Sequence, residues 1–194
     1  RALCGLQVIA LTEETSAKKE MVVVPGLSTS PGPPFKPSPQ ATTAGDFVFV
    51  TGQVASDFQS GLAAEVRKNP EFWYGSPIKL QTEYIMKRFE SILKASESSL
   101  RNVVRADVYL ADMKDFHQFE EVWKNHFPEE PPARTFIPVK RLGPKDCIVE
   151  INMIALKEGG GLKKETVLAD GVPKPDVHHP HAVRAGNFVF LSGM

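Results

Sequence analysis

The residues of this sequence best placed to carry out chemistry are an arginine and a glutamate. Arg134 follows Pro131-Pro132-Ala133 and opens a stretch with the composition of a strand, so rigid prolines set the position of its fork-shaped cation. A guanidinium held in this way suits bidentate binding of a carboxylate. The alternative is a surface arginine that pairs with Glu129 or Glu130.

Glu150 stands inside an apolar segment, Cys147 to Leu156, whose alternate residues are apolar on both faces. A carboxylate on such a sheet face can have a raised pKa and activate a water molecule as a general base. The alternative is a buried ion pair with an arginine. Together Arg134 and Glu150 predict a site that holds an anion beside a water molecule.

Neither the histidines nor the cysteines are spaced as metal ligands. The run His178-His179-Pro180-His181 contains a proline and lacks a nearby cysteine or HxxxH spacing, which favours a linker in solvent. Cys4 and Cys147 lie far apart without a second ligand at metal spacing. Gly159 to Gly161 lacks the lysine and helix of a phosphate-binding loop. We therefore expect neither a metal nor another cofactor.

The periodicity of the chain predicts four strands and two helices. An apolar run at 47–51 predicts a buried strand, and apolar residues at helical spacing predict helices at 78–95 and 115–127. Alternation predicts a strand at 104–110, and two further strands, 134–142 and 147–156, flank Gly143-Pro144 as a hairpin. This order indicates an α+β fold, a mixed sheet with two helices on one face.

The second face of this sheet also carries apolar side chains, among them Ile148, Ile154 and Leu156. Because a sheet face of this kind has to be covered, we expect a partner subunit or a repeated unit to pack on it. The chain is therefore predicted to be a homo-oligomer.

An internal repeat is visible in the sequence. Ala44 to Gln53 returns as Ala185 to Met194 with six of ten positions identical. We expect a complete domain at 36–157, a Gly-rich linker at 158–184, and the first strand of a second copy at 185–194. Residues 1–35 are expected to hold N-terminal strands and a Pro/Gly-rich linker; Val8 to Glu13 resembles Met153 to Glu158, so they are a candidate end of another copy.

Charge and hydropathy exclude two classes of partner. Lys and Arg together number 23, as do Asp and Glu, so the formal net charge is zero and nucleic acid is a poor partner. No apolar run approaches the roughly 18 residues that cross a bilayer. We expect a cytoplasmic protein with no membrane partner.

Four motifs resemble the signature of the YjgF/RidA family in its usual order: Thr51-Gly52-Gln53, Ala106 to Met113, Pro132-Ala133-Arg134-Thr135 and Val149-Glu150-Ile151. The resemblance implies a chorismate-mutase-like fold, a trimeric or pseudo-trimeric barrel, and sites in the clefts between neighbouring sheets. It also implies cofactor-free hydrolysis of reactive enamines and imines, such as 2-aminoacrylate, to a 2-keto acid and ammonia.

The resemblance assigns roles to individual residues. Arg134 matches the family arginine that binds the substrate carboxylate, Glu150 the glutamate associated with water activation, and Gly52, after Thr51, the glycine whose backbone lines the pocket. Two positions depart from the pattern, because Ser38 stands where many members have a tyrosine and Phe136 where they have a cysteine. His179 occupies the tyrosine position of the second copy.

Three functions are consistent with the sequence. The first is a hydrolytic deaminase in which Arg134 grips the carboxylate and Glu150 directs water at the imine carbon. The departures at Ser38 and Phe136 favour a second, a non-catalytic ligand-binding or assembly module of the same fold. The third, an RNA-cleaving translation inhibitor, is disfavoured by the zero net charge.

Overall fold

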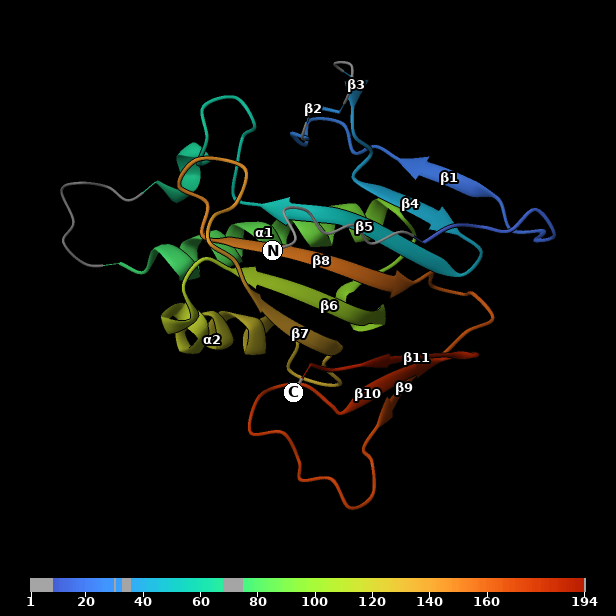
Figure 1. Cartoon of the computed structure of the whole chain (residues 1–194). Coiled ribbons are helices and arrows are strands. Elements are labelled where there is room, and N and C mark those ends of the chain that lie inside the picture. Colours follow the sequence, from blue (N-terminus) through green and yellow to red (C-terminus); the bar gives the residue numbers. More distant parts are fainter. Residues whose placement is uncertain (1–8, 30, 33–35, 68–74, 194) are drawn as a thin grey trace, which may run out of the picture.

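The computed structural model describes residues 9–29, 31–32, 36–67 and 75–193. Its main sheet has six strands, and only the pair β6–β7 is parallel. Two helices, α1 (Pro77–Ala95) and α2 (Phe116–His126), lie on one face of the sheet (Figure 1). The strands run in the order β1 (Lys19–Val22), β4 (Ala41–Ala44), β5 (Phe47–Val54), β8 (Val149–Leu156), β6 (Val103–Leu110) and β7 (Ala133–Pro138).

Short elements connect these strands and helices. The structure has 3₁₀ turns at η1 (Ala64–Val66), η2 (Leu100–Asn102) and η3 (Met113–Asp115), and a two-stranded ribbon of β2 (Pro31–Gly32) and β3 (Lys36–Pro37). Within the described residues, no helix is long and apolar enough to cross a membrane. The α+β fold predicted from the sequence is confirmed.

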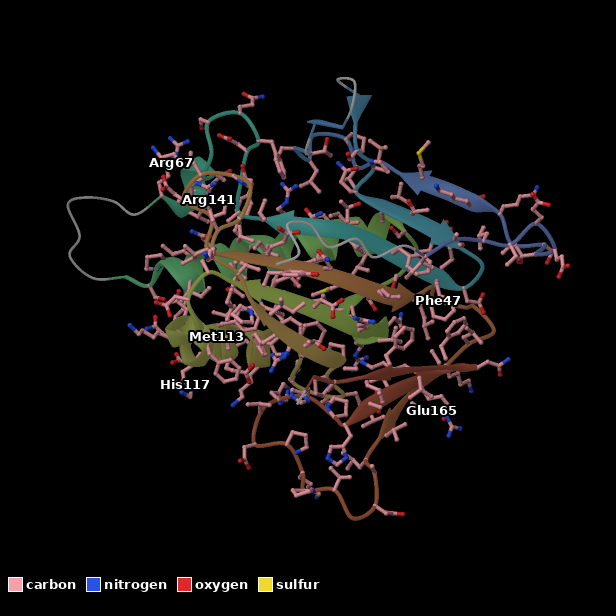
Figure 2. All side chains as sticks on the ribbon, in the orientation of Figure 1. Phe47, Arg67, Met113, His117, Arg141 and Glu165 are labelled. Atoms are coloured by element: carbon pink, nitrogen blue, oxygen red, sulfur yellow. The ribbon has the colours of Figure 1, made fainter. Side chains whose placement is uncertain are left out.

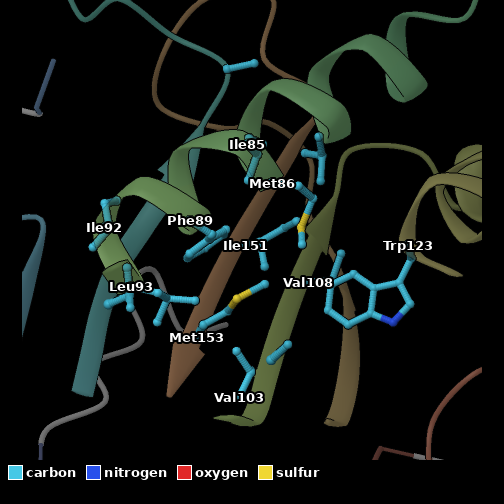
Figure 3. Packing of buried hydrophobic residues seen from close by; sticks show 14 of the residues in the cluster. Ile85, Met86, Phe89, Ile92, Leu93, Val103, Val108, Trp123, Ile151 and Met153 are labelled. Carbon is cyan, nitrogen blue, oxygen red and sulfur yellow. The ribbon is translucent and has the colours of Figure 1, made fainter. Parts of the chain in front are cut away.

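Local sequence explains where α1 begins and which face it buries. Ser76 caps the helix by accepting a hydrogen bond from the Lys79 amide, and Pro77 occupies the first helical position. The buried stripe of α1 packs on alternate residues of β8 and β6, with Trp123 of α2 beside them (Figure 3). In β8 this leaves Glu150 on the opposite face, because successive strand residues point to opposite sides.

The predicted hairpin between 134–142 and 147–156 is wrong. β7 pairs in parallel with β6, while β8 inserts between β5 and β6 and is antiparallel to both. A Gly-Pro sequence indicates a turn but does not say whether the flanking strands pair. The central place of β8 explains why its residues are apolar on both faces.

A second, three-stranded sheet lies next to β7, an edge strand of the main sheet (Figure 1). Its strands run in the order β11 (Phe188–Leu191), β10 (Ala182–Ala185) and β9 (Lys164–Val167). Val183 and Ala185 are buried against Val104, Ala133 and Leu156 of the main sheet. Phe47 of β5 contacts Phe188, with ring centroids 5.3 Å apart. Figure 2 labels Phe47 where the two sheets meet. The repeated strands therefore cover part of the face that the helices leave open.

This small sheet repeats the start of the main sheet residue for residue. Ala44 pairs with Lys19 and with Phe47, and its counterpart Ala185 pairs with Lys164 and with Phe188. The strand pair β9–β10 falls largely within 158–184, where the sequence predicted a linker. β9 is short and mostly exposed, so it carries no hydrophobic periodicity, although 18–22 (KKEMV) and 163–167 (KKETV) share four of five residues. The second copy thus reaches back to Lys163.

The N-terminal segment contributes a strand to the main sheet. Strand β1, from the range 1–35, pairs with β4 and so extends the main sheet. Residues 9–12 form no strand, and residues 1–8 lie outside the described residues. Of the apolar residues expected to need a cover, Ile154 and Leu156 pack in the boundary with the second copy, whereas Ile148 precedes β8 and packs on the main core.

Candidate functional site

Arg134 is completely buried, with 0% of its surface exposed. It is the second residue of β7, and its side chain points to the helical face of the sheet among three aromatic rings. Its guanidinium carbon lies 4.6 Å from the ring centroid of Phe136, 4.8 Å from that of Trp123 and 5.9 Å from that of Phe119. These distances are within the range of cation–π attraction. The surface arginine considered as an alternative is therefore wrong.

Glu120 of α2 is the counter-ion of this arginine. Its carboxylate forms an ion pair with Nη2 of Arg134, and both side chains are nearly or fully buried. Oε1 of Glu120 is therefore the partner of Nη2, while Nε and Nη1 have no hydrogen-bond acceptor within the described residues. Burial lowers the pKa of Arg134 to about 10 while Glu120 opposes the change, so the group is charged at neutral pH.

A buried guanidinium in this state is unusual, because buried polar groups nearly always have hydrogen-bond partners. Its five N–H groups form a planar fork that matches a carboxylate. We use the name Arg134 pocket for the packed cluster of Arg134, Phe119, Glu120, Trp123 and Phe136, which thus has the donor set of an anion site.

The second copy closes this pocket from the edge of β7. The Arg134 amide donates to Oγ of Ser192 at 3.1 Å, and the Arg134 carbonyl oxygen accepts from the Gly193 amide at 3.0 Å. The His178 amide donates to Oε2 of Glu120 at 3.3 Å. β7 is an edge strand, so these bonds satisfy backbone groups that would otherwise face solvent.

The residues that touch Arg134 are the counterparts of a motif in the first copy. The Thr51 hydroxyl donates to the Pro39 carbonyl oxygen at 2.7 Å, and the Ser192 hydroxyl donates to the Pro180 carbonyl oxygen at 2.6 Å. Gly193 therefore corresponds to Gly52. The second copy places its Ser-Gly pair on Arg134.

Glu150 lies elsewhere, on the sheet face away from the helices. Gly52 faces it across β5 and β8: a Cβ atom at Gly52 would come closer than 3.0 Å to Oε1 of Glu150 and Oδ1 of Asn152. Burial raises the pKa of Glu150, the direction needed for a general base near neutral pH. The ion pair considered as an alternative is not present among the described residues.

The remaining predicted site residues divide between the two places. Ser38, Thr51 and Gly52 line a cavity of about 20 Å³ together with Gln53 and Arg88. Phe136 lies in the Arg134 pocket, with its ring 4.8 Å from that of Phe116.

The chain does not bring Arg134 and Glu150 together. β6 separates β8 from β7, Glu150 is level with Tyr109, and Arg134 is level with Ala106. At about 4.8 Å per strand and 3.3 Å per residue, their Cα atoms are about 14 Å apart, and their side chains lie on opposite faces. A site that uses both types of residue therefore needs two units.

Several residues of the pocket were not identified from the sequence. The sequence did contain an indication of Glu120. Its spacing from Phe116, Trp123 and Phe127 places it on the apolar stripe of α2, where a buried carboxylate needs a partner. His178 had none, because its contacts are long-range. Its ring nitrogen Nε2 contacts the Phe127 carbonyl oxygen, so His178 packs on the complete domain, although the run 178–181 was expected to be a solvated linker.

Comparison with known proteins decides the family. The sequence pattern of the Endoribonuclease L-PSP family matches residues 31–157. The chain belongs to this family. It is the YjgF/RidA family that the four motifs resemble, and residues 158–193, which carry the repeated strands, lie beyond the match.

Relatives and solved structures agree with this family. A RutC family protein of Pyrococcus horikoshii is 40% identical over 125 residues, which are 64% of this chain and 90% of that protein. Reactive Intermediate Deaminase A, chloroplastic, of Arabidopsis thaliana is 34% identical over 142 residues, 73% of this chain and 67% of that protein. The crystal structure of yeast Mmf1 has a TM-score of 0.58 at 30% identity and covers 73% of this chain and 100% of its own. The YjgF/RidA fold is thereby established.

Proposed function

We propose that this YjgF/RidA chain is a hydrolytic deaminase of reactive enamines and imines, converting 2-aminoacrylate-like imino acids to 2-keto acids and ammonia. The observation that carries the proposal is the buried Arg134 guanidinium, whose Nε and Nη1 have no hydrogen-bond acceptor among the described residues. An unsatisfied buried donor is costly, and a ligand carboxylate satisfies two donors at once. A relative named Reactive Intermediate Deaminase supports this reaction.

Each site would combine two units of the fold. The position of Ser192 and Gly193 on Arg134 supports a cleft in which one unit supplies the arginine and the next supplies the Ser/Thr-Gly pair and the glutamate. If every cleft is built in this way, an arginine from another copy or another chain would face Thr51, Gly52 and Glu150. The proposal therefore includes an oligomer, or a pseudo-trimer of fused copies.

The chemistry needs only water. The guanidinium orients the carboxylate, which places the imine carbon beside a water molecule held by a glutamate in the position of Glu150. Water oxygen bonds to that carbon, the C=N pair moves to nitrogen, and the resulting carbinolamine loses ammonia as the C=O bond forms. No cofactor enters this scheme.

The test is ammonia release from imino acids generated in situ. Arg134→Ala is expected to abolish release, whereas Arg101→Ala, at a side chain 89% exposed, is expected to retain it. Equal turnover by Arg134→Ala and the parent chain, both folded, would reject the proposal.

A non-catalytic ligand-binding or assembly module is the second candidate. It is favoured by the Arg134 pocket itself, where Glu120 and the Phe136 ring already occupy the surroundings of the guanidinium. This candidate gains if 2-oxobutanoate binds and raises the melting temperature while no imino acid is hydrolysed. RNA cleavage, suggested by the family's name, stays disfavoured by the zero net charge, and the cytoplasmic location stays a prediction.

A further inference from the structure

The charges in the Arg134 pocket already balance. Arg134 is 0% exposed and Glu120 is 7% exposed, and they form one ion pair. The rest of the pocket consists of aromatic rings, those of Phe119, Trp123 and Phe136. The resident guanidinium therefore has a resident anion before any ligand arrives.

This balance restricts the ligands that the pocket can accept. A plain carboxylate would add one negative charge next to Glu120, and an uncompensated charge in a buried, aromatic surrounding is strongly disfavoured. A ligand that carries both a carboxylate and a protonated nitrogen adds no net charge. Two ion pairs then replace one, and each charge keeps a partner.

The geometry of Glu120 allows such a second pair. Oε1 is the atom that faces Arg134, while Oε2 accepts the His178 amide at 3.3 Å and no other donor in the part of the chain that the structure describes. This is a long bond for an N–H donor. A cationic N–H group is a stronger donor to a carboxylate than a neutral amide, so Oε2 has the capacity to receive it.

We propose that the pocket selects zwitterionic ligands, with the carboxylate on Arg134 and the protonated nitrogen on Glu120. The inference rests on the proposed function and names its substrate class: the protonated imino acid, an iminium, rather than the neutral imine. Glu120 is then a specificity-determining residue.

This assignment also suits hydrolysis. An iminium carbon is more electrophilic than that of a neutral imine, so a carboxylate that keeps the nitrogen protonated favours attack by water. Water oxygen bonds to the carbon, the C=N π pair becomes the nitrogen lone pair, and a water proton passes to the general base. The base then returns that proton to the nitrogen and accepts the hydroxyl proton as the C=O bond forms, while the C–N bond breaks and ammonia departs; water is the only co-reactant.

Two ligands with the same carbon skeleton test the inference. L-2-aminobutanoate carries an ammonium group where 2-oxobutanoate carries a ketone, and calorimetric titration gives a Kd for each. The parent chain is expected to bind L-2-aminobutanoate more tightly. In Glu120→Gln the ratio of the two Kd values is expected to shift at least tenfold toward 2-oxobutanoate, about 1.4 kcal/mol.

Glu121→Gln is the matched control. Glu121 is the next residue of the same helix, is 62% exposed and pairs with Lys79, so its ratio should equal that of the parent. Tighter binding of 2-oxobutanoate by the parent overturns the inference even if Glu120→Gln fails to fold. An unchanged ratio in a folded Glu120→Gln protein overturns it as well.

Ammonia release, measured separately on the parent, distinguishes this inference from the proposed function. Preference for L-2-aminobutanoate without ammonia release from imino acids leaves the inference standing and rejects the deaminase. Ammonia release together with preference for 2-oxobutanoate supports the deaminase and rejects the zwitterion rule.

Discussion

Gly193 donates its amide to the carbonyl oxygen of Arg134 across 3.0 Å, and thereby joins the second copy of the fold to the buried arginine of the first. Ser192 adds a second bond, accepting from the Arg134 amide at 3.1 Å. The edge of β7 is thus held by the segment that repeats Thr51 and Gly52. The consequences can be tested one residue at a time.

Ser192→Ala tests the junction between the copies. The change removes the acceptor of the Arg134 amide and the donor to the Pro180 carbonyl oxygen, so we expect a loss of about 1–2 kcal/mol and faster hydrogen exchange at the Arg134 amide. Thr51→Ala is the control, because it loses only the corresponding bond to Pro39. Equal protection of the Arg134 amide in Ser192→Ala and the parent would contradict the junction.

The buried pair of Arg134 and Glu120 is expected to be strongly coupled. Arg134→Met leaves a buried carboxylate without its cation and should cost about 3–5 kcal/mol of unfolding free energy, whereas Arg134→Met/Glu120→Gln should recover most of that loss. Chemical denaturation of both variants and of Glu120→Gln completes the cycle.

The exposed pair of Lys79 and Glu121 provides the comparison. Its side chains are 40% and 62% exposed, and such pairs contribute about 0–1 kcal/mol. A coupling energy for Arg134 and Glu120 no larger than that of the exposed pair would show that the pocket is wet and loosely packed.

Gly52→Ala is predicted to affect activity more than stability. The added Cβ meets the carboxylate end of Glu150 and the amide end of Asn152. These side chains can rotate away, so we expect a loss of about 1 kcal/mol together with a lower rate of imine hydrolysis wherever Glu150 is the base. Gly143→Ala, where an added Cβ has no atom within 4 Å, should match the parent in denaturation and ammonia release. Full activity in a folded Gly52→Ala protein would remove Gly52 from the site.

Glu150 should make stability depend on pH in a definite direction. Burial raises its folded pKa above the ordinary value of 4.5, so between that value and the folded pKa the native state binds more protons than the unfolded state. Stability attributable to Glu150 therefore falls as pH rises through this window. Glu150→Gln should be more stable than the parent above the window, with the difference vanishing below about pH 4.5. A difference of the opposite sign would mean that a cation pairs with Glu150.

Much of this fold follows from periodicity, and the differences from it have physical causes. The stripe of α1 and the alternation in β6 and β8 identify the core because burial repeats at regular spacing along each element. Periodicity does not say which strands pair. β7 was therefore predicted to form a hairpin with β8, whereas it pairs in parallel with β6. β9 was missed because a short exposed strand has no apolar pattern.

The candidate site could likewise be predicted only in part from the sequence. Arg134 and Glu150 were recognisable by residue type and motif, but their separation depends on strand order and face, which no spacing along the chain reveals. The covering of Arg134 by Ser192 and Gly193 arises from contacts 58 residues or more apart. The repeat in the sequence indicated a second copy without indicating where it docks.

The most direct test is the value of kcat/KM for ammonia release from an imino acid generated in situ, compared between the parent and Arg134→Met/Glu120→Gln. This double variant removes the guanidinium without leaving a lone buried charge, so its fold should persist. We predict at least a hundredfold loss, about 2.7 kcal/mol of transition-state stabilisation. A folded double variant with the parent's kcat/KM would contradict the account.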